Sequence, residues 1–255
     1  MSVPSVKPAR GRLFRGAPAY EARTPWGPGS GLLATIAIVV FGFLGAALLL
    51  RLSGLLGPAG LPPRLDALRL MAAAQATIVA LTLLVSALLG GRPREVLALR
   101  SVPAGWRSYG GALLVLAALQ LLLAGVQQSL LKHDTFTDLR PFVDLVRGPD
   151  WPIAAAVVGI GAPLSEELLF RGFLLSALAG TRLGFWGAAL VSTLAWAALH
   201  AGYSAIGLAE VFVIGLFFSW LLWRTGSLRV PIFCHALYNS LTLVVLRFVD
   251  LPSPG

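Results

Sequence analysis

Apolar residues in this chain of 255 residues come in long blocks separated by short polar stretches. The blocks lack the strict alternation of an outer-membrane strand, so they predict helices. Most are close to the roughly 20 residues that a helix needs to cross a bilayer. The pattern therefore predicts an all-α, polytopic transmembrane helical bundle of about seven spans, within a range of six to eight. The seven blocks are Gly31–Leu50, Leu68–Leu89, Tyr109–Leu131, Trp151–Leu178, Phe185–Leu199, Ala205–Trp223 and Val230–Val249.

Composition strengthens this interpretation. Hydrophobic residues make up 57% of the chain and charged residues only 12%, whereas a soluble domain carries about 25% charged residues. A water-soluble globule is thereby excluded. The net charge of +9 would suggest nucleic acid in a soluble protein, but here most basic residues lie between apolar blocks, where they orient spans. We expect no nucleic-acid partner, and we expect the single cysteine, Cys234, to fill the core.

The chain divides into a tail and one membrane-embedded domain. Residues 1–30 are basic and rich in proline and glycine, which predicts a disordered tail, and residues 31–250 form the helical domain. With the amino terminus inside, that side of the membrane receives 12 basic residues and the other side receives 7. This bias predicts a multi-pass protein of the cell membrane whose amino terminus is cytoplasmic.

The first three apolar blocks hold no ionisable residue in their middles, so the candidate chemistry lies after residue 150. A charge at the centre of a transmembrane helix costs about 2.5–3.5 kcal/mol on insertion scales, so each such residue is a functional hypothesis. The acids are Glu166, Glu167 and Glu210, and two histidines, His200 and His235, accompany them. Glu210 either faces a shared cavity and orients a histidine or accepts a hydrogen bond from a neighbouring helix, and we favour the hydrogen bond.

The two adjacent glutamates cannot share one task, because consecutive helical residues point about 100° apart. Glu167 lies four residues before Arg171, the spacing at which helical side chains meet. We therefore expect Glu167 to pair with Arg171 and Glu166 to be free to act as a general base or acid. The competing interpretation is a buried network in which all three charges only hold helices together.

Two further pairs share a spacing of four. Trp196 can form a wall beside His200, and His235 lies one helical turn before Asn239. A carboxylate, two imidazoles and a carboxamide can activate water and stabilise an oxyanion, which suggests hydrolysis of an acyl bond. Glu166 and His200 would activate the water, while His235 and Asn239 would bind the oxyanion. The same Glu166, His200 and His235 also match the ligand set of some catalytic zinc sites, and the residue types leave the two possibilities open.

The depths of these residues raise a difficulty. In straight helices rising about 1.5 Å per residue, His235 would lie only about 9 Å beyond Arg229, whereas Glu166 and His200 would lie more than about 20 Å from the loop at Arg182. Either the turn between Arg224 and Arg229 is sunk within the protein, or the last helix is tilted, or the helix ends differ from those predicted.

The ordered motifs, Glu166-Glu167-x-x-x-Arg171, an aromatic-x-x-x-His ending at His200, and His235-x-x-x-Asn239, resemble the CAAX protease and bacteriocin-processing family, also called the Abi or CPBP family. The resemblance covers residues 150–245. It implies a type II CAAX prenyl endopeptidase-like intramembrane protease in which Glu166, His200, His235 and Asn239 are catalytic and Glu167 and Arg171 support them. Members are often described as metalloproteases, yet the glutamate mechanism implies no required cofactor, with zinc as the alternative. Trp196 replaces the usual Phe, which bears on substrate size.

Three functions follow as hypotheses. The first is a hydrolase, an intramembrane endopeptidase of glutamate type or metallo type acting on a peptide or lipid-modified protein within membrane lipid. The second is a non-catalytic bacteriocin-immunity or peptide-binding protein on the same fold. The third is a small proton-coupled transporter, which the absence of internal repeats disfavours.

Overall fold

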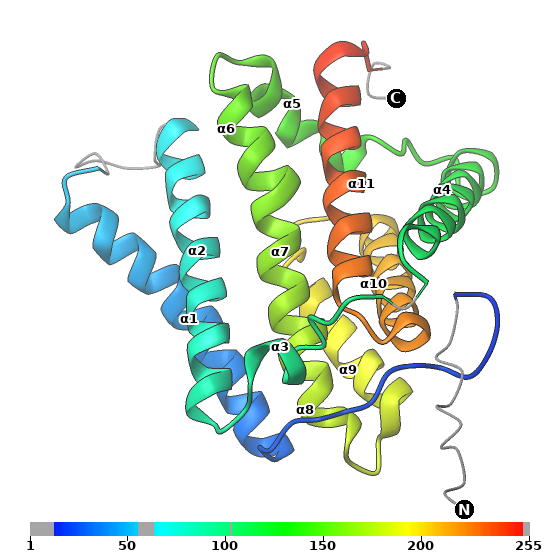
Figure 1. Cartoon of the computed structure of the whole chain (residues 1–255). Helices are drawn as coiled ribbons and strands as arrows, with labels where there is room; N and C mark the ends of the chain where they lie inside the picture. The colour runs from blue at the N-terminus through cyan, green and yellow to red at the C-terminus, as the bar shows by residue number, and fades with distance from the viewer. Residues whose placement is uncertain (1–12, 56–63, 103, 252–255) are drawn as a thin grey trace, which may run out of the picture.

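The computed structural model describes residues 13–55, 64–102 and 104–251. The first part of the predicted tail, residues 1–12, lies outside the described residues. Figure 1 shows a bundle of helices. In chain order these are α1 (Pro28–Leu52), α2 (Arg64–Leu88), α3 (Pro93–Val96), α4 (Trp106–Ser129), η1 (Thr137–Leu139), α5 (Arg140–Arg147), α6 (Trp151–Ala156), η2 (Val157–Gly161), α7 (Ala162–Glu166), η3 (Glu167–Leu174), α8 (Leu175–Ala179), α9 (Gly184–Ala198), α10 (Ala205–Thr225) and α11 (Arg229–Phe248).

Six helical stretches of the described chain are long and apolar enough to cross a membrane, and α9 is a shorter apolar helix. This confirms the polytopic helical bundle and the predicted range of spans. One stretch, Trp151–Ala179, is a continuous rod assembled from α6, η2, α7, η3 and α8. Half of its apolar window (50%) is buried inside the protein, compared with 11–44% for the other five. The rod is therefore the central column of the bundle.

The other helices surround this rod. α11 packs against η2 and α7, and α1 and α2 pack against η3. Figure 1 shows α1 and α2 on one side of the rod and α4 on the other. The turn between α8 and α9 and the carboxyl end of α11 lie at opposite ends of the bundle (Figure 1). A buried column touched by most of the other helices is well placed to carry a polar site away from lipid.

Residues 13–27, which we call the N-terminal strap, differ from the disordered tail that their composition predicts. Backbone N–H groups of Ala19 and Tyr20 both donate to the carbonyl of Trp223 at 3.2 Å. The ring of Trp26 stacks on Phe173 with centroids 4.9 Å apart. The strap is held because its few apolar side chains find buried sites on the helices, a tertiary effect that composition does not reveal.

A phenol also fastens the strap to the central rod. Burial raises the pKa of Tyr20 to about 12, so its hydroxyl keeps its proton and donates to Ser176 Oγ at 2.9 Å. Arg224 completes the attachment by donating from Nε to the carbonyl of Leu13 at 2.9 Å. The strap thus crosses from the rod to the end of α10.

The turn between α10 and α11 is sunk within the protein. Ser227 and Leu228 are fully buried, and the N–H of Leu228 donates to the carbonyl of Ala98 at 2.9 Å. Gly226 has φ +63° and lies so close to the strap that a Cβ there would be 2.5 Å from the carbonyl oxygen of Ala19, so glycine satisfies both constraints. Of the three explanations for the depth difficulty, the structure shows the sunken turn.

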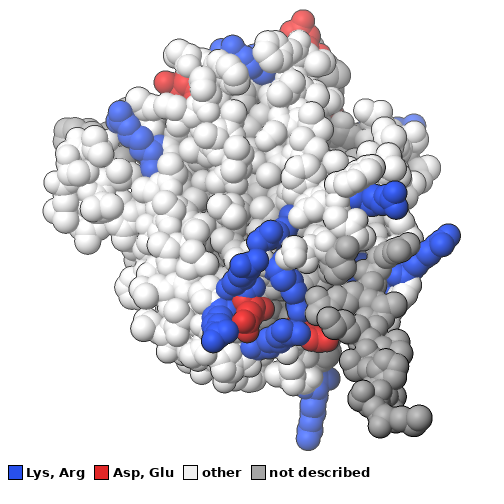
Figure 2. Space-filling view, in the orientation of Figure 1, with Lys and Arg blue, Asp and Glu red and all other residues white. Residues whose placement is uncertain are grey.

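Basic side chains gather at the end of the molecule that carries α3, as the space-filling view shows (Figure 2). Exposed arginines at this end include Arg92, Arg94 and Arg229. Arg229 donates from Nε to the carbonyl of Leu99 at 3.0 Å. The segment around Leu99, which covers the sunken turn, therefore also positions one of these arginines.

The strap gives the first prediction. Trp26→Ala is expected to destabilise the fold by about 3 kcal/mol, because truncating a large buried aromatic leaves a cavity against Phe173. The measurement is the temperature at which purified full-length protein in detergent loses its monodisperse peak in size-exclusion chromatography. Trp106, whose side chain is 78% exposed, gives the matched control Trp106→Ala. Equal midpoints for the two variants would show that the strap does not stabilise the bundle.

Candidate active site

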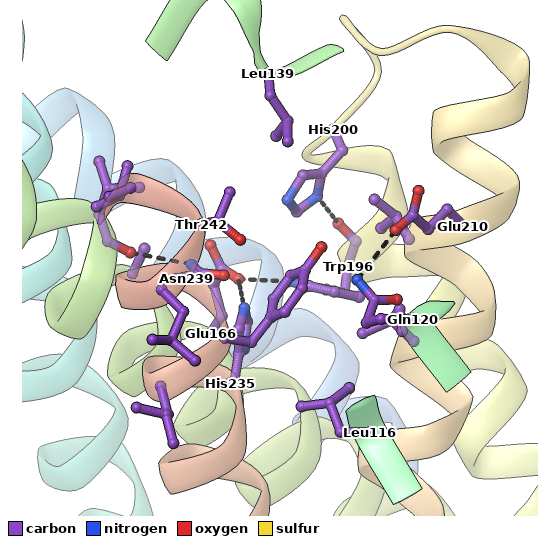
Figure 3. A pocket seen from close by; sticks show the side chains of 18 of the residues that line it. Leu116, Gln120, Leu139, Glu166, Trp196, His200, Glu210, His235, Asn239 and Thr242 are labelled. Carbon is purple, nitrogen blue, oxygen red and sulfur yellow. Dashed lines mark hydrogen bonds and ion pairs between the residues drawn. The ribbon is translucent and has the colours of Figure 1, made fainter. Parts of the chain in front are cut away.

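One cavity of about 1640 Å³ lies within the bundle, and its lining is mostly apolar. Five of the seven predicted site residues line it: Glu166, Trp196, His200, His235 and Asn239. Figure 3 shows these side chains gathered from the rod, α9 and α11. The other two, Glu167 and Arg171, are completely buried. The structure thus separates the two adjacent glutamates, one facing the cavity and one buried.

Two π-helical segments lie on either side of Glu166. η2 precedes α7, which ends at Glu166, and η3 begins at the next residue. Such segments change the backbone hydrogen-bond pattern and are frequent at functional sites. The carbonyl of Val158 in η2 accepts a hydrogen bond from Asn239 Nδ2 at 3.0 Å. Gly159 allows the close approach, since a Cβ there would be 2.8 Å from Ser240 Oγ. η2 therefore fixes the position of Asn239 on α11.

Glu166 is the acid that reaches the cavity. Its side chain is 20% exposed, and its Oε2 accepts a hydrogen bond from Trp196 Nε1 at 2.6 Å. The same Oε2 lies 3.9 Å from His235 Nε2. This separation is too long for a direct hydrogen bond but suits a single water molecule that bonds to both atoms.

Glu167 anchors His235 from behind. Its Oε1 accepts from His235 Nδ1 at 3.0 Å and from Arg171 Nη1 at 3.2 Å. Because a carboxylate only accepts, Nδ1 carries the proton, and Nε2 is the nitrogen directed toward Glu166. The Glu167–Arg171 pair has the i,i+4 spacing expected from the sequence. The pair contacts the cavity lining through His235 and through the ring of Trp196.

Trp196 contacts both the buried ion pair and His200. Its ring lies under Arg171, with the guanidinium carbon 4.2 Å from the ring centroid, and its carbonyl is 3.2 Å from His200 Nδ1. The Nδ1–H of His200 therefore donates to its own helix, which directs the lone pair of Nε2 away from this contact. The imidazole also packs edge-on against Trp196, with centroids 5.0 Å apart. This is the contact between Trp196 and His200 that their spacing of four predicts.

Sequence reasoning missed Phe218 on α10, whose ring stacks on His235 with centroids 4.8 Å apart and planes 26° apart. Phe218 is fully buried. Its ring covers one face of the imidazole and so restricts rotation of that side chain. No motif marks this phenylalanine among the apolar residues of its helix, so only the fold reveals it.

Asp138 was also missed. It comes from the loop before α5 and accepts from the N–H of Ser204 at 2.7 Å and from Ser204 Oγ at 2.8 Å. Ser204 caps α10 by accepting from the N–H of Gly207 at 3.0 Å. Asp138 thereby fastens its loop to the turn that carries His200. A serine before an apolar run is a recognisable cap, but nothing in the sequence pairs it with Asp138.

Glu210 accepts hydrogen bonds from two amides of α4, Gln127 Nε2 at 2.6 Å and Gln120 Nε2 at 3.3 Å. This is the interhelical arrangement that we favoured from the sequence. Glu210 also lines the same cavity as Glu166.

The candidate zinc ligands do not fit a metal centre in this arrangement. Among residues 13–55, 64–102 and 104–251, no three His, Cys, Asp or Glu side chains are placed to hold a metal ion. Because Glu167 engages His235 Nδ1 and the carbonyl of Trp196 engages His200 Nδ1, only the Nε2 atoms of these histidines could bind a metal. A catalytic zinc site needs three such ligands at about 2.0–2.2 Å from one point.

Comparison with known proteins finds similarity over part of the chain. Residues 148–241 match the family model "Type II CAAX prenyl endopeptidase Rce1-like". An Escherichia coli protein named "Uncharacterized 24.3 kDa protein" is 35% identical over 98 residues, 38% of this chain and 45% of that protein. "Putative membrane peptidase YdiL" of Bacillus subtilis (strain 168) is 30% identical over 94 residues, 37% of each chain. These matches span less than half of either relative. No solved structure matches this chain.

The matched residues include the central rod, α9, α10 and the two predicted site residues of α11, and they contain the motifs found in the sequence. Residues 148–241 of the chain are thus similar to the Rce1-like family of type II CAAX prenyl endopeptidases.

Proposed function

We propose that this protein is an intramembrane endopeptidase in which Glu166 activates a water molecule to cleave a peptide bond. The observation that carries this proposal is the 3.9 Å separation of Glu166 Oε2 and His235 Nε2 at the wall of a cavity inside a membrane bundle. That gap suits one water, and a water held beside a carboxylate is ready to lose a proton.

The steps use the residues that line the cavity. Glu166, assisted by the free Nε2 of His200, takes a proton from the water as its oxygen attacks the carbonyl carbon. The oxyanion accepts hydrogen bonds from His235 Nε2 when that nitrogen is protonated, and from the second N–H of the Asn239 amide. Glu166 then returns its proton to the leaving amine, which completes the hydrolysis.

The buried pair supports this chemistry. Glu167 fixes the imidazole of His235 and Arg171 fixes Glu167, so neither needs to touch the substrate. Trp196 donates to Glu166 and stacks beside His200, which orients the base and its helper together. Pre-organised groups of this kind reduce the reorganisation required during the reaction.

The cavity also limits the substrate. A volume of about 1640 Å³ exceeds the roughly 300–1,000 Å³ of ordinary small-ligand pockets. We propose a peptide or lipid-modified protein substrate, whose apolar part would contact the apolar lining. The basic end that bears α3 and the strap would face the cytoplasm, as positive charge does in multi-pass proteins.

Replacing the proposed base is the direct test. Glu166→Gln keeps the size of the side chain and a hydrogen-bond acceptor for Trp196 but cannot take a proton, so cleavage should fall by at least about 100-fold. The measurement is mass-spectrometric detection of products from a peptide library incubated with purified full-length protein. Glu95→Gln, at an exposed position on α3, is the matched control. Undiminished cleavage by Glu166→Gln would refute the base, and peptide binding without cleavage by the wild type would favour the non-catalytic alternative.

Metal dependence is tested on the same reaction. We expect that cleavage by the wild-type protein is unchanged after incubation with a zinc chelator, because the described residues do not form a metal site. Loss of cleavage in chelator, restored by added Zn²⁺ and not by Mg²⁺, would contradict the metal-free mechanism.

The buried pair gives a stability prediction. Arg171→Met leaves Glu167 as a buried charge that keeps only His235 as a partner, which should cost about 3–5 kcal/mol. The double variant with Glu167→Leu and Arg171→Met should regain part of that stability because it removes both charges. Thermal unfolding in detergent measures both, and Arg92→Met, at a side chain that is 86% exposed, is the control. A double variant less stable than Arg171→Met would argue against charge burial as the cause.

A further inference from the structure

Glu210 is a carboxylate of the cavity that the proposed hydrolysis does not use. It lies on the second turn of α10, and both of its oxygens are held by amides of α4. Figure 3 shows Glu210 and Gln120 on the side of the cavity away from Asn239, with Glu166 between them in this view. The carboxylate is therefore fixed in place and shares the space that the scissile peptide would enter.

The charge of Glu210 is not neutralised by a basic side chain. Across the part of the chain that the structure describes, no Lys, Arg or His forms an ion pair with Glu210. Among the described residues, the cavity lining contains one arginine, Arg107, and two histidines, against three carboxylates. Glutamine donors stabilise a carboxylate without cancelling its charge. A cation entering the cavity would supply the missing partner.

Aromatic side chains strengthen this reading. Tyr203 and Tyr238 line the same cavity as Glu210. The negative face of an aromatic ring attracts ammonium and guanidinium groups, most strongly where water is excluded. A cavity lined by a carboxylate and by phenol rings offers both kinds of group that bind cations.

A purely structural role does not account for the residue type. If Glu210 only tied α10 to α4, a glutamine could bond to the same two amides once one of them turned its carbonyl oxygen inward, without the insertion cost of a charge. An acid retained at this depth, on a cavity wall, is the default sign of function.

We propose that Glu210 is a substrate-recognition subsite that binds a cationic group of the peptide, either a lysine or arginine side chain or a free amino terminus. The proposal rests on the proposed function for its peptide ligand. Within that function Glu210 determines specificity and takes no part in the chemical step, which belongs to the Glu166 side of the cavity.

Binding in a cleavage-deficient protein tests this proposal separately from catalysis. The probes are three pools of short, fluorescent apolar peptides. The first pool has one lysine and an acetylated amino terminus, the second has that lysine acetylated as well, and the third has the acetylated lysine with a free amino terminus. Each pool is titrated against full-length protein that carries Glu166→Gln, and against the same protein with Glu210→Gln or Glu95→Gln added.

We expect the Glu166→Gln protein to bind at least one of the two cationic pools about tenfold more tightly than the uncharged pool, as one charge-assisted hydrogen bond allows. The preferred pool identifies the source of the cation. Adding Glu210→Gln should abolish the preference, and adding Glu95→Gln, which removes a carboxylate outside the cavity, should leave it intact.

Equal binding of all three pools by the Glu166→Gln protein would overturn the subsite, and so would a preference that survives Glu210→Gln. If Glu210→Gln does not fold, Glu210→Asp replaces it, and its shorter reach should reduce the preference severalfold; an unchanged preference again overturns the proposal. Cation preference in a wild-type protein that cleaves no peptide would refute the endopeptidase and retain the subsite. Cleavage by the wild type without any cation preference would retain the endopeptidase and refute the subsite.

Discussion

The completely buried ion pair of Glu167 and Arg171 is the constraint on which the site depends. Neither charge tolerates removal from water alone, and their spacing of four on one helix brings them together before any tertiary contact forms. The pair still leaves acceptor capacity on Glu167, which the imidazole of His235 fills. The cost of burying charge in the bundle thus draws α11 onto the central rod, and it does so at the helical turn that places His235 Nε2 opposite Glu166.

Three irregular features surround the candidate catalytic residues. The short α9 ends near His200, the turn before α11 is sunk beneath the strap and residues 97–100, and the rod contains two π-helical segments. Each departs from a straight span, and each is compensated locally. Asp138 and Ser204 complete the end of α9 and the start of α10, while Asn239 satisfies Val158 in the rod. Irregular backbone within a membrane is tolerated where protein groups satisfy it, and here those groups belong to the site.

The sequence predicts those parts of the fold and site that depend on residues close together in the chain. The helical spans and the Glu167–Arg171 pair depend on periodicity over a few residues, and the sequence predicts them. The gathering of Glu166, Trp196, His200, His235 and Asn239 at one cavity followed from motif spacing and from resemblance. Phe218, Asp138 and the partners of Glu210 depend on contacts between distant segments, and no local signal marks them. The ordered strap was missed because the overall composition of residues 1–30 does not show that Tyr20 and Trp26 have packing sites on the helices.

Trp196 shows why the two neighbouring glutamates differ in role. Its indole N–H can donate to one acceptor only, and that acceptor is Glu166. Its ring face meanwhile receives the guanidinium of Arg171, which belongs to Glu167. One side chain thus holds the cavity acid by its edge and the buried pair by its face, and its carbonyl orients His200. A phenylalanine at this position would keep the face and the carbonyl but leave Glu166 without that donor. The tryptophan in this chain therefore adds a positional constraint on the proposed base that the aromatic wall alone does not provide.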